Sequence, residues 1–160
     1  MKKFNYIKIR ISSFFDSSSN NNSQAEKASE AIIDGGFFGK GIGEGTLNSK
    51  IPEAHTDFIV SVISEEFGII IIFLIMLAFI FFAYNIFKKI RDTNDNVFKL
   101  ILTGLISLLL MQAFVHVGVN LKVLPTTGMT LPFISYGGSS IISISIVSGI
   151  ILNLTKRRVY

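Results

Sequence analysis

The sequence predicts an all-α integral membrane protein with three transmembrane helices, preceded by a large extracytoplasmic loop region. Hydrophobic residues make up 49% of the 160-residue chain, and the mean hydropathy is +0.55. These residues are gathered into long runs, and basic residues stand at the ends of the runs. Basic flanks of this kind are typical of membrane spans whose charged ends face the cytoplasm.

Each apolar run is long enough to cross a bilayer. The first, 67–87, has no charged residue and would cover roughly 31 Å as a helix, close to a hydrocarbon core of about 30 Å. The second, about 98–119, carries Gln112 and His116 one turn apart. We expect them to hydrogen-bond within the helix bundle, with a proton relay as the alternative. The third, about 134–154, is rich in glycine and serine, so we expect close helix contacts inside a bundle.

The charge distribution predicts the orientation. Basic clusters follow the first and third spans: Lys88, Lys89, Arg91, Lys156, Arg157 and Arg158. The positive-inside rule places both clusters, and therefore the C-terminus, in the cytoplasm. Residues 1–57 then face outward and form the predicted extracytoplasmic region. The membrane region follows at 58–160, and its loop 121–133 faces outward as well.

The start of the chain does not fit this orientation. Lys8 and Arg10 interrupt its apolar residues, so we expect no cleavable signal. So basic an N-terminus would rather stay in the cytoplasm. The conflict disappears if this region is a loop between two spans, so we interpret the chain as a fragment that lacks the preceding spans. The polar tract 17–23 is predicted to be flexible, with a plain disordered tail as the alternative.

Several function classes are disfavoured. The chain has no cysteine and only two histidines, which are far apart, so a disulfide framework is excluded and no metal site is predicted. The net charge of +4 sits at the ends of the apolar runs, which favours membrane topology over a nucleic-acid partner.

A glycine-dense run occupies 35–45. It has neither the spacing of a P-loop nor the strand and helix context of a dinucleotide site. Two interpretations stay open. The run is a loop that needs positive φ angles at several positions, or it is a backbone that offers N–H groups to phosphate, with Lys40 adding charge.

Ionisable and polar groups gather just before the first span: Glu53, His55, Thr56 and Asp57. Such groups at the mouth of a span indicate function, although a helix N-cap is the alternative for Asp57. On a helix that starts here, the 3.6-residue period places four polar residues on one face: Asp57, Ser61, Ser64 and Glu65. Such a face requires a wet cavity or partner helices.

The segment 124–140 contains two prolines and three glycines, which prevent a regular helix entry. Irregular backbone at membrane depth is tolerated only where it is buried in protein or lines a cavity. We therefore expect a re-entrant turn packed through Gly137 and Gly138, rather than direct chemistry by residues 135–140.

Two of these segments carry a family resemblance. Pro-Glu-Ala-His-Thr-Asp-Phe-Ile at 52–59 and Leu-Pro-Phe-Ile-Ser-Tyr-Gly-Gly-Ser-Ser at 131–140 resemble the SEDS family (shape, elongation, division and sporulation). The glycine run and Glu65-Glu66 match it as well, and 125–132 is closer to the division branch, FtsW, than to the elongation branch, RodA. Family members have about ten spans, so the resemblance implies the outer loop and the last three. Ser64 departs from the pattern, since glycine is more usual there.

The resemblance implies a peptidoglycan glycosyltransferase of the bacterial cytoplasmic membrane that polymerises lipid II. It points to Asp57 as the general base and to Lys40 as the cation for the leaving pyrophosphate. Glu53, His55 and Glu65 would bind substrate or tune Asp57, and the use of a divalent cation stays open. The implied partners are the missing spans, a class B penicillin-binding protein and other division proteins. The alternatives are lipid II translocation, or an inactive remnant that at most binds division partners.

Overall fold

The computed structural model describes residues 20–51 and 53–156, and every regular element in that part of the chain is a helix. The helices are α2 (Asn20–Gly35), α3 (Leu47–Lys50), α4 (Ile59–Phe67), α5 (Ile69–Arg91), α6 (Asn96–Asn120) and α7 (Gly138–Thr155). Three of them, α5, α6 and α7, are long and apolar enough to cross a membrane. The predicted fold class, an all-helical chain with three candidate membrane spans, is therefore confirmed.

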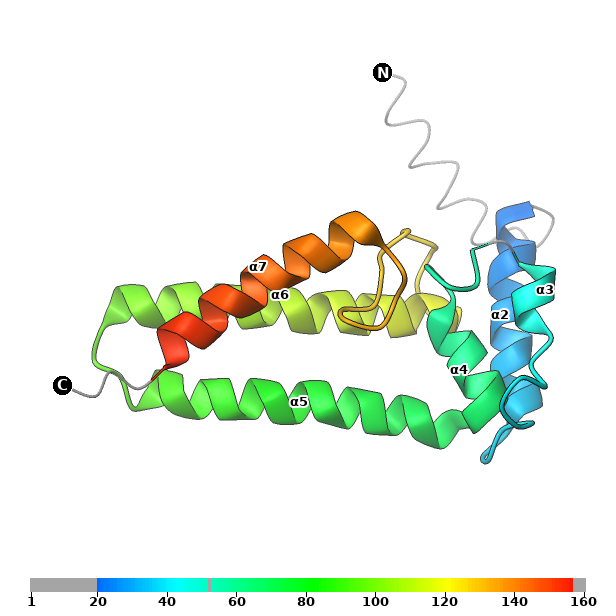
Figure 1. The fold of residues 1–160 in the computed structure, drawn as a ribbon, viewed down its shortest axis with the longest axis horizontal. Coiled ribbons are helices and arrows are strands. Elements are labelled where there is room, and N and C mark those ends of the chain that lie inside the picture. Colours follow the sequence, from blue (N-terminus) through cyan, green and yellow to red (C-terminus); the bar gives the residue numbers. More distant parts are fainter. Residues whose placement is uncertain (1–19, 52, 157–160) are drawn as a thin grey trace, which may run out of the picture.

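The long helices α5 and α6 run side by side, and α7 lies across them (Figure 1). They share a core of buried aliphatic side chains: Ala83, Ile86, Ile90, Leu102, Ile106, Leu109, Ile144 and Ile151. The carboxylate of Asp95 caps α6 by accepting a hydrogen bond of 2.9 Å from the Val97 N–H. The third span begins at Gly138 rather than near residue 134, because the preceding segment is irregular and Phe133 has a φ of 65°.

A smaller helical layer, α2 to α4, lies at one end of the long helices (Figure 1). Its core joins alanines of α2 to Leu47, Ile51 and Phe58. Because α2 begins at Asn20, it includes the end of the tract that we expected to be flexible. The rest of that tract, the basic N-terminus with Lys2, Lys3, Lys8 and Arg10, and also Arg157 and Arg158 lie outside the described residues.

Gly68 separates α4 from α5, so the acidic segment does not open directly into the span as the sequence suggested. Its φ is 84°, and a Cβ built there would lie 2.1 Å from the carbonyl oxygen of Phe37. The glycine run provides that close backbone approach. Its amides at Lys40 and Gly41 donate to the carbonyls of Glu65 and Glu66 at 2.9 and 3.1 Å.

The loop interpretation of the glycine run is confirmed, because Gly36, Gly39, Gly41 and Gly43 all have positive φ angles. The run closes around the last turn of α4, whose carbonyls would otherwise lack partners. In addition, the Ile69 N–H at the start of α5 donates to the Gly36 carbonyl at 2.9 Å. The loop is therefore bonded to both helices that meet at Gly68.

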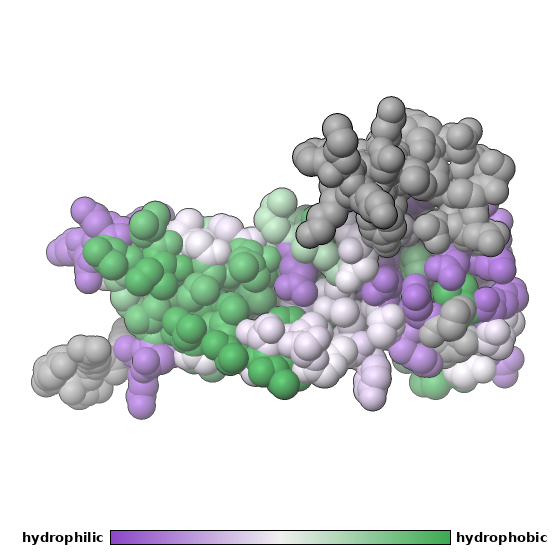
Figure 2. All heavy atoms as spheres, turned by 90° about the horizontal axis from the view of Figure 1, so that it is seen from above, coloured by the Kyte–Doolittle hydropathy of each residue, from purple (hydrophilic) through white to green (hydrophobic). Residues whose placement is uncertain are grey.

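The three long helices expose much apolar surface. Figure 2 shows hydrophobic side chains along this part of the molecule, with hydrophilic surface towards either end. Within α7 only Ile144 and Ile151 are buried. The serines and glycines for which we expected close helix contacts, such as Ser143, Ser145 and Gly149, are exposed. Their predicted contacts are therefore not made within the described residues.

We expect Gly39→Ala to destabilise the fold more than Gly43→Ala. Both positions have a positive φ, near +80°, which costs an L-residue about 1–2 kcal/mol. At Gly39 the new Cβ would also meet the Glu66 carbonyl oxygen at 2.1 Å, whereas at Gly43 nothing lies within 4 Å. Thermal unfolding in detergent micelles, followed by circular dichroism, measures both variants. Equal losses of stability would show that the close approach does not matter.

Candidate active site around Asp57

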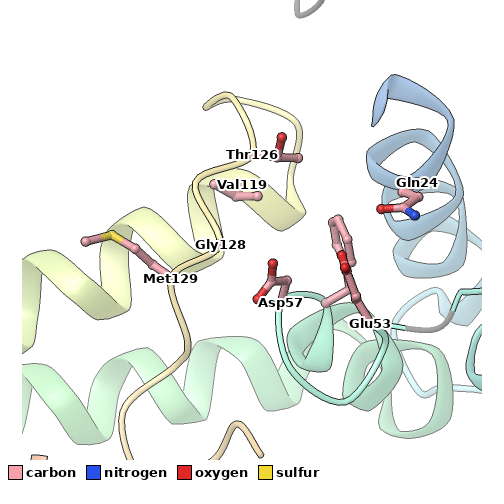
Figure 3. Close-up of a pocket in the computed structure, with 8 residues that line it drawn as sticks. Gln24, Glu53, Asp57, Val119, Thr126, Gly128 and Met129 are labelled. Carbon is pink, nitrogen blue, oxygen red and sulfur yellow. The ribbon is translucent and has the colours of Figure 1, made fainter. Parts of the chain in front are cut away.

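A pocket of about 220 Å³ lies where the outer helical layer meets the end of α6 (Figure 3). Its lining comes from α2, the turn before α4, α6 and the α6–α7 loop, through Gln24, Glu53, Asp57, Phe58, Val119, Thr126, Gly128 and Met129. Two of these residues, Glu53 and Asp57, carry carboxylates and stand on one turn (Figure 3). The pocket therefore combines acidic groups with the polar side chains of Gln24 and Thr126.

Asp57 is half-buried at this pocket. The α6–α7 loop passes close to its carboxylate, since a Cβ built on Gly128 would lie 3.7 Å from Asp57 Oδ2. Gly128 also has a φ of 69°, a conformation that glycine adopts without strain. A residue with a side chain at 128 would therefore strain the loop, and its Cβ would lie in van der Waals contact with the carboxylate.

The Asp57 turn is held in place by hydrogen bonds to three of its own consecutive backbone carbonyls, those of residues 55–57. The Tyr136 N–H donates to the His55 oxygen at 3.0 Å, and the Ser135 hydroxyl donates to the Thr56 oxygen at 2.9 Å. The Asn120 amide donates to the Asp57 oxygen at 3.0 Å. The predicted re-entrant segment thus has a structural role, as expected for Ser135. Packing is tight at Gly137, but a Cβ on Gly138 would meet nothing within 4 Å.

Asn120 is fully buried and joins α6 to α4. Its Oδ1 accepts from the Ser61 hydroxyl at 2.8 Å and from the Ser61 N–H at 3.2 Å. Its Nδ2 also donates to the His116 carbonyl at 2.8 Å. Our sequence reasoning missed this residue, although Gln112, His116 and Asn120 recur every four residues on one face of an otherwise apolar helix.

The expected hydrogen bonds of Gln112 and His116 are present, but their partners are loops rather than another span. Gln112 Nε2 donates to the Thr130 carbonyl at 2.9 Å. His116 is buried, and its Nε2 lies 3.4 Å from the Thr56 carbonyl. Because a carbonyl only accepts, this contact requires the proton on Nε2. Both side chains therefore bond backbone next to residues that line the pocket, Gln112 beside Met129 and His116 beside Asp57.

The predicted polar face of the helix after Asp57 is buried against protein. Ser61, Ser64 and Glu65 are at most 1% exposed, so packed protein, including the glycine loop around Glu65, surrounds them rather than a wet cavity. Ser61 bonds Asn120, whereas Ser64 Oγ is buried without a hydrogen-bond partner among the described residues. Glycine, which the resemblance in the sequence implied is more usual at this position, would leave no such group unpaired.

Glu65 and Lys40 form a second polar cluster at the far end of α4. Lys40 Nζ lies 3.0 Å from Glu65 Oε1 and 3.3 Å from Asp34 Oδ2. The amides of Thr46 and Leu47 each donate to Glu65 at 3.0 Å. Burial acts to raise the pKa of Glu65, but these hydrogen bonds outweigh it and lower the pKa to about 2. The hydrogen bond to Glu65 in turn raises the pKa of Lys40.

The structure thus brings Glu53 to Asp57 but leaves the other predicted site residues outside the pocket. Lys40 and Glu65 do not line it, and the exposed side chain of His55 does not either. Among the described residues, no group of three or more histidine, aspartate or glutamate side chains could hold a metal ion. Gln24, Thr126 and Met129 line the pocket although sequence reasoning gave them no role there.

We expect Glu65→Gln to lower stability at pH 7 by about 1–3 kcal/mol, since the amide replaces only part of the hydrogen bonds that the buried carboxylate accepts from Lys40, Thr46 and Leu47. The pKa of Glu65 is lowered from 4.5 to about 2 on folding. Its stabilisation is therefore complete above about pH 4.5 and is lost as the pH falls towards 2. Melting temperatures between pH 2 and pH 7 test this. Glu30→Gln, which removes an exposed carboxylate of α2, is the control. Parallel pH profiles for wild type and Glu65→Gln would contradict the assignment.

We expect Asn120→Ala to loosen the Asp57 turn, because it leaves the Asp57 carbonyl and the Ser61 hydroxyl without their partner. Hydrogen exchange followed by mass spectrometry should be faster in peptides covering 55–62. Gln112→Ala is a matched control, since it frees only the Thr130 carbonyl and should leave those peptides unchanged. If Asn120→Ala left exchange in 55–62 at the wild-type rate, Asn120 would not hold the turn.

Comparison with known proteins gives the family of the chain. The sequence model of the FtsW/RodA/SpoVE family, described as cell cycle proteins, matches residues 2–160. The probable peptidoglycan glycosyltransferase FtsW of Caulobacter vibrioides (strain NA1000 / CB15N) is 39% identical over 155 residues, which are 97% of this chain and 40% of the relative. The probable FtsW enzyme of Geobacter sp. (strain M18) is 43% identical over 129 residues, 79% of this chain and 35% of that protein.

A solved structure has the same fold. It is a chain from a peptidoglycan synthase complex that coordinates polymerization and crosslinking, with a TM-score of 0.71 and 28% sequence identity. The match covers 94% of this chain and 41% of that chain. The present chain therefore spans about two fifths of the length of these proteins, and its three candidate spans correspond to part of a larger membrane structure.

The resemblance found in the sequence motifs is confirmed by a family match that covers nearly every residue. From this match and its multi-pass helical fold, the chain belongs to the FtsW/RodA/SpoVE family of cell cycle proteins, the SEDS family.

Proposed function

We propose that this chain forms part of a peptidoglycan glycosyltransferase that polymerises lipid II into glycan strands during cell division. The relatives are probable peptidoglycan glycosyltransferases. The observation that carries the proposal is the position of Asp57. Its half-buried carboxylate lines a pocket, and its backbone is fixed by hydrogen bonds to the carbonyls of residues 55–57. A positioned acid in a polar pocket suits a reaction in which a hydroxyl must lose a proton.

In this reaction a sugar hydroxyl of the acceptor attacks the anomeric carbon of the donor, and the lipid pyrophosphate leaves as an anion. The Asp57 carboxylate would take the proton of the attacking hydroxyl as general base. Inversion at the anomeric carbon requires this base to work on the face opposite the leaving group. The anchored turn supports the role, because a catalytic group must be held within a fraction of an ångström of its working position.

Glu53, Gln24 and Thr126 would bind the sugars, since they line the same pocket as Asp57. The imidazole of His55 would contact substrate from outside the pocket, because this side chain is exposed and does not line the pocket. Lys40 lies outside the Asp57 pocket, at the far end of α4, so its proposed role of offsetting charge on the leaving pyrophosphate requires a substrate that extends along that helix. The weaker partner of Lys40 is Asp34, whose side chain is 60% exposed, and a phosphate oxygen would replace that carboxylate. Glu65 would stay as the anchor that keeps Lys40 in place.

In this proposal the Asp57 pocket lies on the extracytoplasmic side of the cytoplasmic membrane, and the C-terminus lies in the cytoplasm. Lys88, Lys89 and Arg91 in the last turn of α5, together with Lys156 after α7, support this orientation. The remaining spans of the enzyme and a class B penicillin-binding protein would be the partners. Support for the second comes from the matched structure, a synthase complex that coordinates polymerization and crosslinking.

The test of this proposal supplies the part of the enzyme that the chain does not contain. The part of the Caulobacter relative that this chain does not match is co-expressed with the chain, and the purified complex is given labelled lipid II. We expect glycan strands on a gel, and we expect Asp57→Asn to reduce the rate at least about 100-fold, because the general base is lost. Glu30→Gln, an exposed carboxylate outside the pocket, should leave the rate unchanged.

Two outcomes would contradict the proposal. A stable complex that makes no glycan, while the intact Caulobacter protein does, would show that the chain is an inactive remnant. Glycan synthesis at the wild-type rate by Asp57→Asn would remove Asp57 from the role of base.

A further inference from the structure

At the other end of the long helices, α5 and α7 end and α6 begins (Figure 1). A pocket with a basic and an apolar part lies there. Its volume is about 500 Å³, and it is lined by Asn85, Lys88, Lys89, Asp92, Thr93, Phe98, Leu154, Thr155 and Lys156. Figure 2 shows hydrophilic surface at this end, next to the apolar surface of the long helices. The pocket is therefore at the level where a membrane span meets the lipid headgroups.

The charge of this pocket is positive. Three lysines line it against one carboxylate, that of Asp92. Lys89 Nζ donates to the Thr155 carbonyl at 2.8 Å and so ties α5 to α7. Lys88 and Lys156 are exposed, and neither forms an ion pair with a carboxylate among the described residues. The ammonium groups of Lys88 and Lys156 are thus available to a ligand, whereas that of Lys89 is used to join the two helices.

The floor of the pocket is apolar. Phe98 and Leu154 line it, are half-buried, and belong to the packed face of the long helices. A basic rim above an apolar floor matches a molecule that carries an anionic group on a hydrocarbon chain. Topology alone explains basic residues at helix ends, but it does not require them to border a pocket with apolar side chains in its lining.

We propose that this pocket binds the phosphate headgroup of an anionic phospholipid. Lys88 and Lys156 pair with the phosphate, and the first methylenes of the lipid lie against Phe98 and Leu154. Basic pockets between transmembrane helices hold anionic headgroups in this way. A free phosphate ion would use the same lysines but gains nothing from the apolar floor, so the observations favour the lipid.

The test uses the 160-residue chain in detergent micelles. It is titrated with phosphatidylglycerol or with phosphatidylcholine of the same acyl chains, and retained lipid is counted by native mass spectrometry. We expect preferential retention of phosphatidylglycerol. The double variant Lys88→Gln/Lys156→Gln should bind it on the order of tenfold more weakly, since each lysine contributes to headgroup binding. Lys89 is left intact because it supports the fold, and circular dichroism confirms that each variant is helical.

A matched control removes the same charge from the same end of the molecule. Arg91→Gln/Lys99→Gln alters residues that do not line the pocket, and it should retain the wild-type preference. An equal loss in both double variants would mean diffuse surface attraction and would overturn the pocket. Equal retention of the two lipids by the wild type would overturn it as well. Displacement of phosphatidylglycerol by millimolar inorganic phosphate would show that the ligand is the free ion. None of these outcomes depends on glycosyltransferase activity.

Discussion

The hydrogen bonds to the carbonyls of residues 55–57 are the constraint on which the candidate site depends. The donors come from far along the chain, since Asn120 lies 63 residues after Asp57 and Ser135 lies 79 residues after Thr56. Buried carbonyls need such partners, because leaving them unpaired costs as much as a lost hydrogen bond. The Asp57 turn therefore takes its shape only when α6 and the α6–α7 segment have packed against it, and the pocket forms together with the tertiary structure.

Two carboxylates near opposite ends of α4 have opposite surroundings: Asp57 in the turn before the helix and Glu65 in its last turns. Both oxygens of Glu65 accept hydrogen bonds, from Lys40, Thr46 and Leu47, in a site that is almost fully buried. A carboxylate so well supplied with donors is held in its charged form and serves the fold. Asp57 is half-buried and faces a pocket together with Glu53. Acidic residues near each other in sequence thus have different tasks, because one is enclosed by donors and the other borders open space.

The sequence predicted the three long helices well, because uninterrupted apolar runs depend only on local composition. It also predicted the irregular backbone before α7, since two prolines and three glycines cannot enter a helix regularly. The pairing of Lys40 with Glu65 could not be predicted, because it spans 25 residues and requires the glycine loop to fold around α4. Asn120 was overlooked at the end of an apolar run, and its importance depends on where the Asp57 turn packs. Ser64 looked like part of a functional face, yet its hydroxyl has no partner among the described residues.

Gly68 has the appearance of a hinge, since it separates two helices and has a φ of 84°. The glycine loop removes that freedom. It donates to α4 through Lys40 and Gly41, and it accepts from α5 at Gly36. A rotation of α5 against α4 would have to break the hydrogen bonds between the loop and one of the two helices. We therefore expect the loop to resist bending at Gly68, so that a change in the tilt of α5 is passed to α4 and to the turn before it, which carries Asp57.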